Sequence, residues 1–245
     1  MSKQCTCGRS AAYPFCDNTH KQPAGPVIQT INPHAFMYFN KDQSEDKKIV
    51  QISKFVSKPF SDRLIEVFEK DSLWQDVGFY KAKNLFHINF EEKDLADNWE
   101  TLMSTTKRAV EAVFKSKVVM SSVYIQKWPE GSYGVKHNDT YNFDGSIANL
   151  RSKIASTLFL HSPFTGGDLE FPDHDVSIQP KLGSLYTFQG GPGNEHQITK
   201  ITSGLRYTVI SFWDFEDANY TEEEIKAMNS SEERWKNYIK TGEGL

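Results

Sequence analysis

ASTLFLHSPFTGGDLEFPDHDVSIQPKLGSLYTFQ, residues 155–189, is the stretch of sequence that decides the fold. It contains four short runs rich in apolar and β-branched residues, and Gly, Pro and Asp turns separate them. Two similar runs flank it, VVMSSVYIQKW (118–128) before and LRYTVISFW (205–213) after. Several strands at such short spacing favour an antiparallel sandwich or jelly roll.

Helical patterns lie on both sides of this β-rich part. The pattern over 60–76 predicts a helix with Ser61 as N-cap and with Leu64, Val67 and Phe68 on one face. A second helix is predicted over 94–117, where one apolar stripe recurs at helical spacing: Trp99, Leu102, Thr106, Ala109 and Val113. A third is predicted over 221–239, capped by Thr221.

These patterns predict an α+β, mostly β protein with an antiparallel sandwich or jelly-roll core at about 118–215. Helical support at about 60–117 and the C-terminal helix belong to the same domain, 29–245, and residues 1–28 form a separate metal-binding arm. With 24% charged residues and a net charge of −4, the chain carries no strong field for nucleic acid. No membrane span or secretory signal is visible, so we expect a cytoplasmic protein.

A metal site is predicted from the segment KHNDT (136–140) and a distant histidine. His137 and Asp139 point to one side if the chain is extended, although this pair alone also fits a surface loop. His196, expected in a turn between two strands, supplies a third ligand. Two histidines and one carboxylate form the facial triad typical of non-haem Fe(II) oxygenases. His161 and His174 are competing candidate ligands, but neither stands in a His-x-Asp pair with an inward arginine downstream.

Arg206 begins the last long β run and shares one face with Thr208 and Ile210. A guanidinium directed into an apolar interior is costly unless it meets an anion, and a carboxylate is its natural bidentate partner. Arg206 paired to a surface aspartate is the alternative.

Residues 118–213 resemble the prolyl 4-hydroxylase-like branch of the 2-oxoglutarate/Fe(II) dioxygenases. The matching elements are WPEGSYGVKHND, FTGGDLEFP, IQPKLGSLYTF, His196, and a basic residue ten positions after it. The resemblance implies a double-stranded β-helix core of the jelly-roll, cupin-like kind. It also implies Fe(II) on His137, Asp139 and His196, and 2-oxoglutarate whose far carboxylate meets Arg206, with Thr208 as a second donor. It implies that 2-oxoglutarate and O2 give succinate and CO2 while a C–H bond is hydroxylated, with ascorbate as a candidate reductant.

The chain departs from the family at two tyrosine positions. Trp128 stands nine residues before the first ligand, and Phe159 occupies the other position, so Tyr124 is the candidate replacement. The closest resemblance favours a prolyl residue in a peptide or protein as substrate, contacted by Trp128 or Arg151. A free amino acid or other small molecule is the alternative, and a non-catalytic binding module is more remote. A nucleic-acid substrate is not expected, because position 212 is Phe where that branch carries a second arginine.

The N-terminal string CTCGRSAAYPFCDNTH holds all three cysteines of the chain. Cys5, Cys7, Cys16 and His20 make a four-ligand set that suits structural zinc or an iron–sulfur cluster. Their spacing resembles the CDGSH-type [2Fe–2S] motif, with Asn18 in place of a glycine. The resemblance implies a [2Fe–2S] cluster on this arm, with zinc as the alternative.

Overall fold

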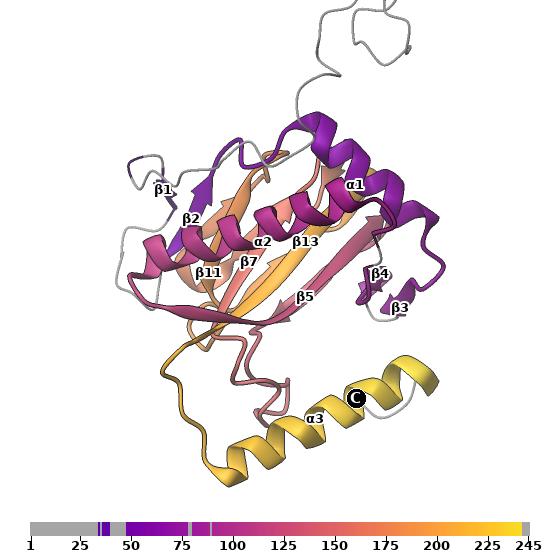
Figure 1. The fold of residues 1–245 in the computed structure, drawn as a ribbon. Coiled ribbons are helices and arrows are strands. Elements are labelled where there is room, and N and C mark those ends of the chain that lie inside the picture. The colour runs from indigo at the N-terminus through magenta and orange to yellow at the C-terminus, as the bar shows by residue number, and fades with distance from the viewer. Residues whose placement is uncertain (1–33, 35, 40–47, 78–79, 89, 242–245) are drawn as a thin grey trace, which may run out of the picture.

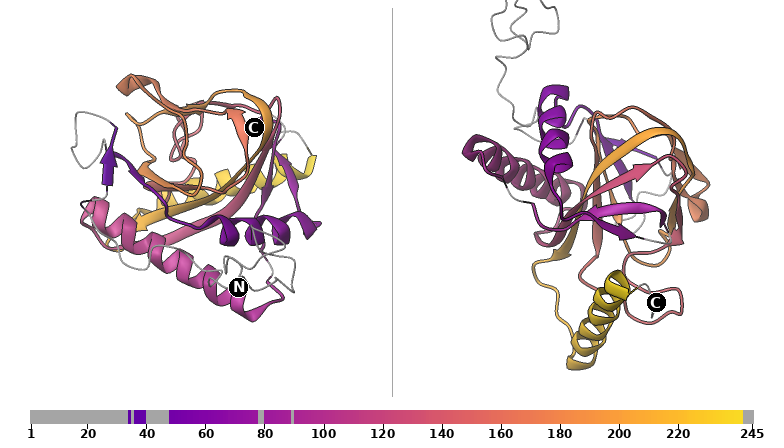
Figure 2. Two further views of the ribbon diagram at one scale, coloured as in Figure 1. Left: turned by 90° about the horizontal axis from the view of Figure 1, so that it is seen from above. Right: turned by 90° about the vertical axis from the view of Figure 1, so that its right-hand side faces the viewer.

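The computed structural model describes residues 34, 36–39, 48–77, 80–88 and 90–241. In this part of the chain, two antiparallel sheets face each other and three α-helices lie outside them (Figure 1, Figure 2). The predicted class, α+β and mostly β with a jelly-roll core, is confirmed. None of the described helices combines the length and apolarity needed to cross a lipid bilayer.

The larger sheet has nine strands. Eight follow the order β1 (Phe36–Tyr38), β2 (Ile49–Ile52), β11 (Leu185–Gln189), β7 (Ile154–Phe159), β13 (Ile201–Phe215), β5 (Val118–Pro129), β4 (Ala82–Leu85) and β3 (Gln75–Val77), and β8 (Phe164–Gly166) pairs with β13. The smaller sheet has the order β10 (Val176–Ile178), β9 (Leu169–Phe171), β12 (His196–Ile198) and β6 (Gly134–His137), and a short 3-10 turn (Pro172–His174) joins β9 to β10.

Two apolar clusters lie on opposite faces of the larger sheet, because successive side chains of a strand alternate between its faces. The outer cluster joins the sheet to the first two helices, through residues such as Val209 of β13 and Leu158 of β7. The inner cluster fills the space between the two sheets and includes Phe159, Phe171 and Phe188. In the described part of the chain, the first two helices, the large sheet and the small sheet therefore form three layers (Figure 2).

Helix α2 (Lys93–Phe114) runs along the outer face of the large sheet, with α1 (Lys58–Lys70) beside it (Figure 1). The predicted apolar stripe of α2 is confirmed, since Leu102, Ala109 and Val113 are buried in the outer cluster. Lys115, the residue directly after the helix, adopts a left-handed conformation with φ of 53°, and this conformation ends the helix.

The predicted boundaries of α1 were wrong. Ser57, not Ser61, caps the helix by accepting a hydrogen bond from the Phe60 N–H at 3.3 Å, and Ser61 is buried in the first turn. The helix stops at Lys70 rather than at Asp76, and 75–77 form strand β3. Proline at position 59 explains the earlier start, because proline is favoured in the first turn of a helix.

Helix α3 (Glu222–Thr241) lies below the barrel, beside the loop that follows β6 (Figure 1). The predicted cap is confirmed: Thr221 Oγ1 accepts from the Glu224 N–H at 3.2 Å, and Glu224 Oε2 accepts from the Thr221 N–H at 2.8 Å. Asn142 of the loop donates to Ser231 Oγ at 3.4 Å, so α3 is tied to the segment that leaves the metal-site strand.

Candidate metal centre

Strands β6 and β12 bring two histidines face to face. His137 is the last residue of β6 and His196 the first of β12, and the two stand directly opposite in the antiparallel register. Their ring centroids are 4.5 Å apart. The prediction that His196 lies in a turn was wrong, because this residue is already the first residue of strand β12.

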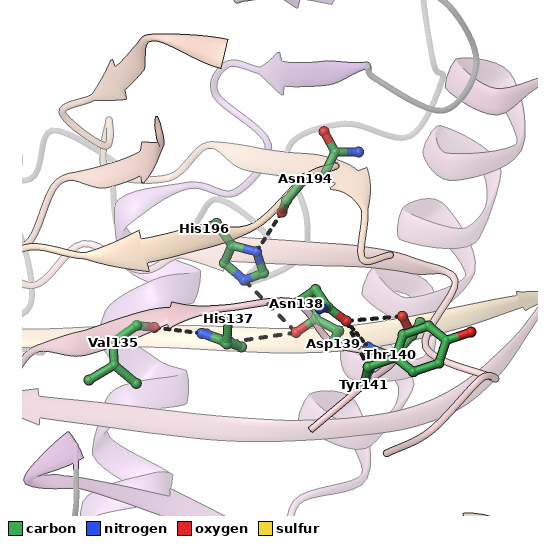
Figure 3. A network of polar contacts seen from close by, with 8 residues as sticks. All are labelled: Val135, His137, Asn138, Asp139, Thr140, Tyr141, Asn194 and His196. Atoms are coloured by element: carbon green, nitrogen blue, oxygen red, sulfur yellow. Dashed lines mark hydrogen bonds and ion pairs between the residues drawn. The ribbon is translucent and has the colours of Figure 1, made fainter. Parts of the chain in front are cut away.

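Asp139 reaches the same point from the turn after β6 (Figure 3). Its N–H donates to the Gly190 carbonyl at 2.7 Å, which ties the turn to the end of β11. The side chain of Asn138 points the other way and accepts from the N–H groups of Thr140 at 3.1 Å and Tyr141 at 2.8 Å. Backbone and side-chain bonds thus hold Asp139 toward the two histidines.

The histidine rings present the same nitrogen to the carboxylate. Nδ1 of His137 lies 2.8 Å from the Val135 carbonyl, and Nδ1 of His196 lies 3.1 Å from the Asn194 carbonyl. A carbonyl accepts only, so Nδ1 carries the proton and Nε2 has a free lone pair. The two Nε2 atoms lie 3.7 and 3.8 Å from Asp139 Oδ1, too far for a hydrogen bond. The three ligand atoms lie within 4.8 Å of one another, an arrangement that suits one shared metal ion.

The electrostatics of the triad also fit a cation. Burial lowers the pKa of His137 to about 4, helped by the neighbouring His196, and burial lowers that of His196 to about 4. Both rings are therefore neutral near pH 7, the form that binds metals. Burial raises the pKa of Asp139 to about 6, and its buried Oδ2 has no hydrogen-bond partner. A buried carboxylate without a partner is costly, and a bound divalent ion removes that cost.

Gly190 makes room for this carboxylate. A Cβ at position 190 would lie 2.7 Å from Asp139 Oδ2 and 2.6 Å from the Ser152 carbonyl oxygen. Backbone cannot retreat from such an overlap as a flexible side chain can, so a side chain at 190 would displace Asp139 from the triad.

Arg206 lies on β13 with its guanidinium inside the barrel. The residue is 2% exposed, and its Nε and Nη1 atoms are buried without a hydrogen-bond partner. The guanidinium carbon lies 5.2 Å from the ring centre of Trp128 and 4.7 Å from that of Phe159. Burial lowers the pKa of Arg206 to about 9, so the group stays charged near neutral pH. The alternative, a surface aspartate as its partner, is not realised, since these nitrogens are unpaired.

Comparison with known proteins gives the fold a context. No family model matches the sequence, and no curated protein sequence matches it either. Among solved structures, the viral collagen prolyl hydroxylase of Paramecium Bursaria Chlorella virus-1, in its 2OG complex, matches with a TM-score of 0.55 at 17% identity, over 68% of this chain and 95% of that one. The fold is that of the 2-oxoglutarate/Fe(II) oxygenases.

Two further structures of this fold match as well. The prolyl hydroxylase of Trichoplax adhaerens, in complex with a hypoxia inducible factor peptide fragment, has a TM-score of 0.55 at 16% identity, over 75% of this chain and 86% of that one. A Pseudomonas putida prolyl-4-hydroxylase has a TM-score of 0.53 at 15% identity, over 69% of this chain and 92% of that one. At such identities the likeness concerns the fold, and the activity has to be argued from the site.

Two tyrosine side chains lie near the triad. Tyr124 points inward from β5, with its ring 5.2 Å from Phe86, and burial and then the charge of Asp139 raise its pKa. Tyr80, between β3 and β4, has its ring 6.0 Å from that of His137 and 5.8 Å from that of Trp128, and the same two causes raise its pKa. Sequence reasoning missed Tyr80, because it lies far upstream of the β-rich part and no motif marks it.

The remaining candidate residues lie at different distances from the triad. Trp128 is buried beneath Arg206, and its Nε1–H donates to Gln126 Oε1 at 3.2 Å. Arg151 is exposed in the turn before β7, where its N–H donates to Asn149 Oδ1, and it does not contact the triad. His174 lies close to the site as a neighbour of Asn194, 2.7 Å from its Oδ1, and not as a ligand.

The predicted arm ligands Cys5, Cys7, Cys16 and His20 lie outside the described residues. The [2Fe–2S] cluster, the zinc alternative and the division into an arm 1–28 and a domain 29–245 therefore stay predictions.

Proposed function

We propose that this protein is an Fe(II)- and 2-oxoglutarate-dependent dioxygenase that hydroxylates an unactivated C–H bond. The single observation that carries the proposal is the unpaired, buried Arg206 inside the same barrel as the His137–Asp139–His196 triad. The balanced reaction converts substrate, 2-oxoglutarate and O2 into hydroxylated substrate, succinate and CO2. One oxygen atom of O2 enters the substrate and the other enters succinate.

His137, Asp139 and His196 would hold the iron, which when bound supplies the redox chemistry that activates O2. Because the protein would supply only three ligands, the iron would remain open to further ligands such as the co-substrate. The protein's own part is to hold both imidazoles as neutral donors and to keep Asp139 ionised beside them. Gly190 contributes by leaving space for that carboxylate.

Arg206 would bind the far carboxylate of 2-oxoglutarate through its two unpaired donors. Thr208, fully buried with an unpaired hydroxyl two residues along the same strand face, would donate to the same group. The rings of Trp128 and Phe159 flank the guanidinium and fix its position. Tyr124 would be a further contact of the co-substrate in place of the tyrosines that the family places elsewhere.

For the substrate we propose a prolyl residue in a peptide or protein. The support is the fold shared with three proteins named as prolyl hydroxylases, one of them bound to a peptide fragment. Trp128 and Arg151 are proposed substrate contacts, and ascorbate is a proposed reductant. A free amino acid as substrate is the second candidate, because it would use the same triad and Arg206.

An anaerobic titration tests the proposed function. Fe(II) and then 2-oxoglutarate are added to the purified protein, and difference spectra are recorded so that any cluster on the arm cancels. A weak visible charge-transfer band that saturates with 2-oxoglutarate is expected. Absence of 2-oxoglutarate binding, by this band and by calorimetry, would contradict the proposal and favour a non-catalytic binding module.

A further inference from the structure

A row of polar side chains continues from Thr208 across the inner face of the large sheet, beyond the part that the proposed chemistry uses. Thr208 of β13 stands opposite Gln126 of β5, and Gln126 stands opposite Asn84 of β4. Asn84 in turn stands opposite Gln75 of β3. Ala82, two residues before Asn84 on the same strand, belongs to the inner apolar cluster, so this side of β4 faces the barrel interior.

The middle of this row is buried and incompletely paired. Asn84 is 3% exposed and Gln126 is 6% exposed. Gln126 Oε1 accepts the Trp128 indole N–H, so this glutamine positions the ring that flanks Arg206. Asn84 Oδ1, in contrast, is buried and accepts no hydrogen bond.

The unpaired buried atoms of the molecule concentrate around this row. Of eight such side-chain atoms in the described residues, five belong to Asn84, Asp139, Arg206 and Thr208. A buried polar atom destabilises the protein when no partner is supplied, and a charged one does so more than a neutral one. Iron and 2-oxoglutarate would satisfy Asp139, Arg206 and Thr208. Asn84 remains, with a buried carbonyl oxygen that no group of the described residues pairs.

The charges around Asn84 favour a neutral donor. Besides the triad, the buried charged side chains of the described part are Lys48, Arg206 and Asp214. Lys48 donates to the Val113 carbonyl at 3.1 Å on the outer side of the sheet, and Asp214 accepts from the Tyr220 hydroxyl at 2.9 Å. Within the described residues, no buried carboxylate outside the metal triad is thus left to pair with an ammonium group. Burying an unpaired ammonium is far costlier than burying an amide.

We propose that Asn84 is a specificity-determining residue that recognises a neutral amide of the substrate. Its Oδ1 would accept an amide N–H, and its Nδ2 would donate to the carbonyl of the neighbouring amide. The substrate class is then a peptide or other amide rather than a free, zwitterionic amino acid. This inference rests on the proposed function and narrows its substrate.

The test measures binding, so that it does not depend on turnover. Full-length protein loaded with Mn(II) in place of Fe(II) and saturated with 2-oxoglutarate is titrated calorimetrically with two kinds of probe. The first is a panel of capped tripeptides with central proline, N-acetylated and C-amidated, and the second is free proline. Wild type is expected to bind at least one capped peptide and to prefer it over free proline by at least about tenfold.

Three variants make the result specific. Asn84→Leu is expected to weaken capped-peptide binding about tenfold, the loss expected for one neutral hydrogen bond, and to leave 2-oxoglutarate binding unchanged. Asn84→Asp supplies the missing carboxylate and is expected to shift the preference toward free proline. Lys83→Ala is the matched control, because this neighbour lies on the opposite face of β4 and pairs with Asp76 at 3.3 Å.

Several outcomes would overturn the inference while leaving the proposed Fe(II)- and 2-oxoglutarate-dependent activity intact. They are equal binding of free proline and capped peptides, no binding of any capped peptide, and unchanged peptide binding in Asn84→Leu. Loss of 2-oxoglutarate binding in Asn84→Leu, with Lys83→Ala normal, would make Asn84 a structural residue. Wild-type protein that fails to bind 2-oxoglutarate is a different result, since it would remove the proposed function and this inference together.

Discussion

The two faces of the large sheet differ in how completely their polar groups are paired. On the outer face, the Tyr207 hydroxyl donates to Glu69 at 2.5 Å, and Lys127 pairs with the same carboxylate at 2.8 Å. On the inner face, one residue away on the same strand, Arg206 and Thr208 have buried atoms without partners. Since unpaired buried groups reduce stability, the outer face holds the fold together and the inner face is prepared for ligands.

The largest effect on the function of the inner face is expected from removing a metal ligand. His137→Ala is expected to reduce 2-oxoglutarate turnover to background, because two remaining ligands cannot hold the iron in the same geometry. Far-UV circular dichroism should be unchanged, because the ring lies at the end of a strand and not in either sheet's centre. His87→Ala, which changes an exposed histidine, is the control. Full turnover in His137→Ala would show that the ligand assignment is wrong.

Arg206→Met separates binding from stability on the inner face. The dissociation constant for 2-oxoglutarate is expected to rise about 100-fold, because a carboxylate would be left buried without its cation. Unfolding of the ligand-free variant by denaturant should show a free energy no lower than that of wild type, because an apolar side chain replaces an unpaired buried charge. A large loss of stability would mean that Arg206 has a structural partner that the ligand-free barrel requires.

Val209→Ala is the corresponding change on the outer face. Val209 is buried in the cluster beneath the first two helices, so the free energy of unfolding should fall by about 2 kcal/mol through lost contacts and a residual void. The affinity for 2-oxoglutarate should not change, since this side chain points away from the barrel interior. A 2-oxoglutarate affinity that fell as in Arg206→Met would show that the two faces are not independent.

The placement of the candidate site residues on the inner face could be predicted from the sequence wherever strand alternation or spacing indicated it. The inward direction of Arg206 follows from the two-residue period of strands, and six β runs marked six of the strands correctly. The triad was predicted from the spacing within KHNDT and one distant histidine. The apolar stripe of α2 was equally clear. These are long or strongly periodic segments, in which the pattern itself reports the burial.

The parts that the sequence did not reveal depend on tertiary contacts. Strand β4 reads AKNL, and only its pairing with β5 places Asn84 on the inner face. Tyr80 reaches His137 only because the β3–β4 segment extends the sheet beside the barrel. The two serines near the start of α1 are both suitable caps by residue type, and Pro59, which the prediction did not weigh, favours Ser57.

The pH dependence of metal binding gives the smallest and most specific test of the difference between the faces. Because the pKa of Asp139 in the metal-free protein is raised to about 6, from an ordinary 3.8, a proton competes with the metal below that pH. The pKa values of His137 and His196 are lowered to about 4, from 6.5, so their rings do not compete until the solution is much more acidic. The dissociation constant for Mn(II), measured by calorimetry, should therefore rise about tenfold per pH unit below about 6, which is the slope for one displaced proton. If His137 and His196 had the ordinary histidine pKa of 6.5, two protons would compete with the metal, and the dissociation constant would rise about 100-fold per pH unit below about 6.5. That steeper slope would show that the triad is solvated and that the inner face is not the dry, unpaired site described above.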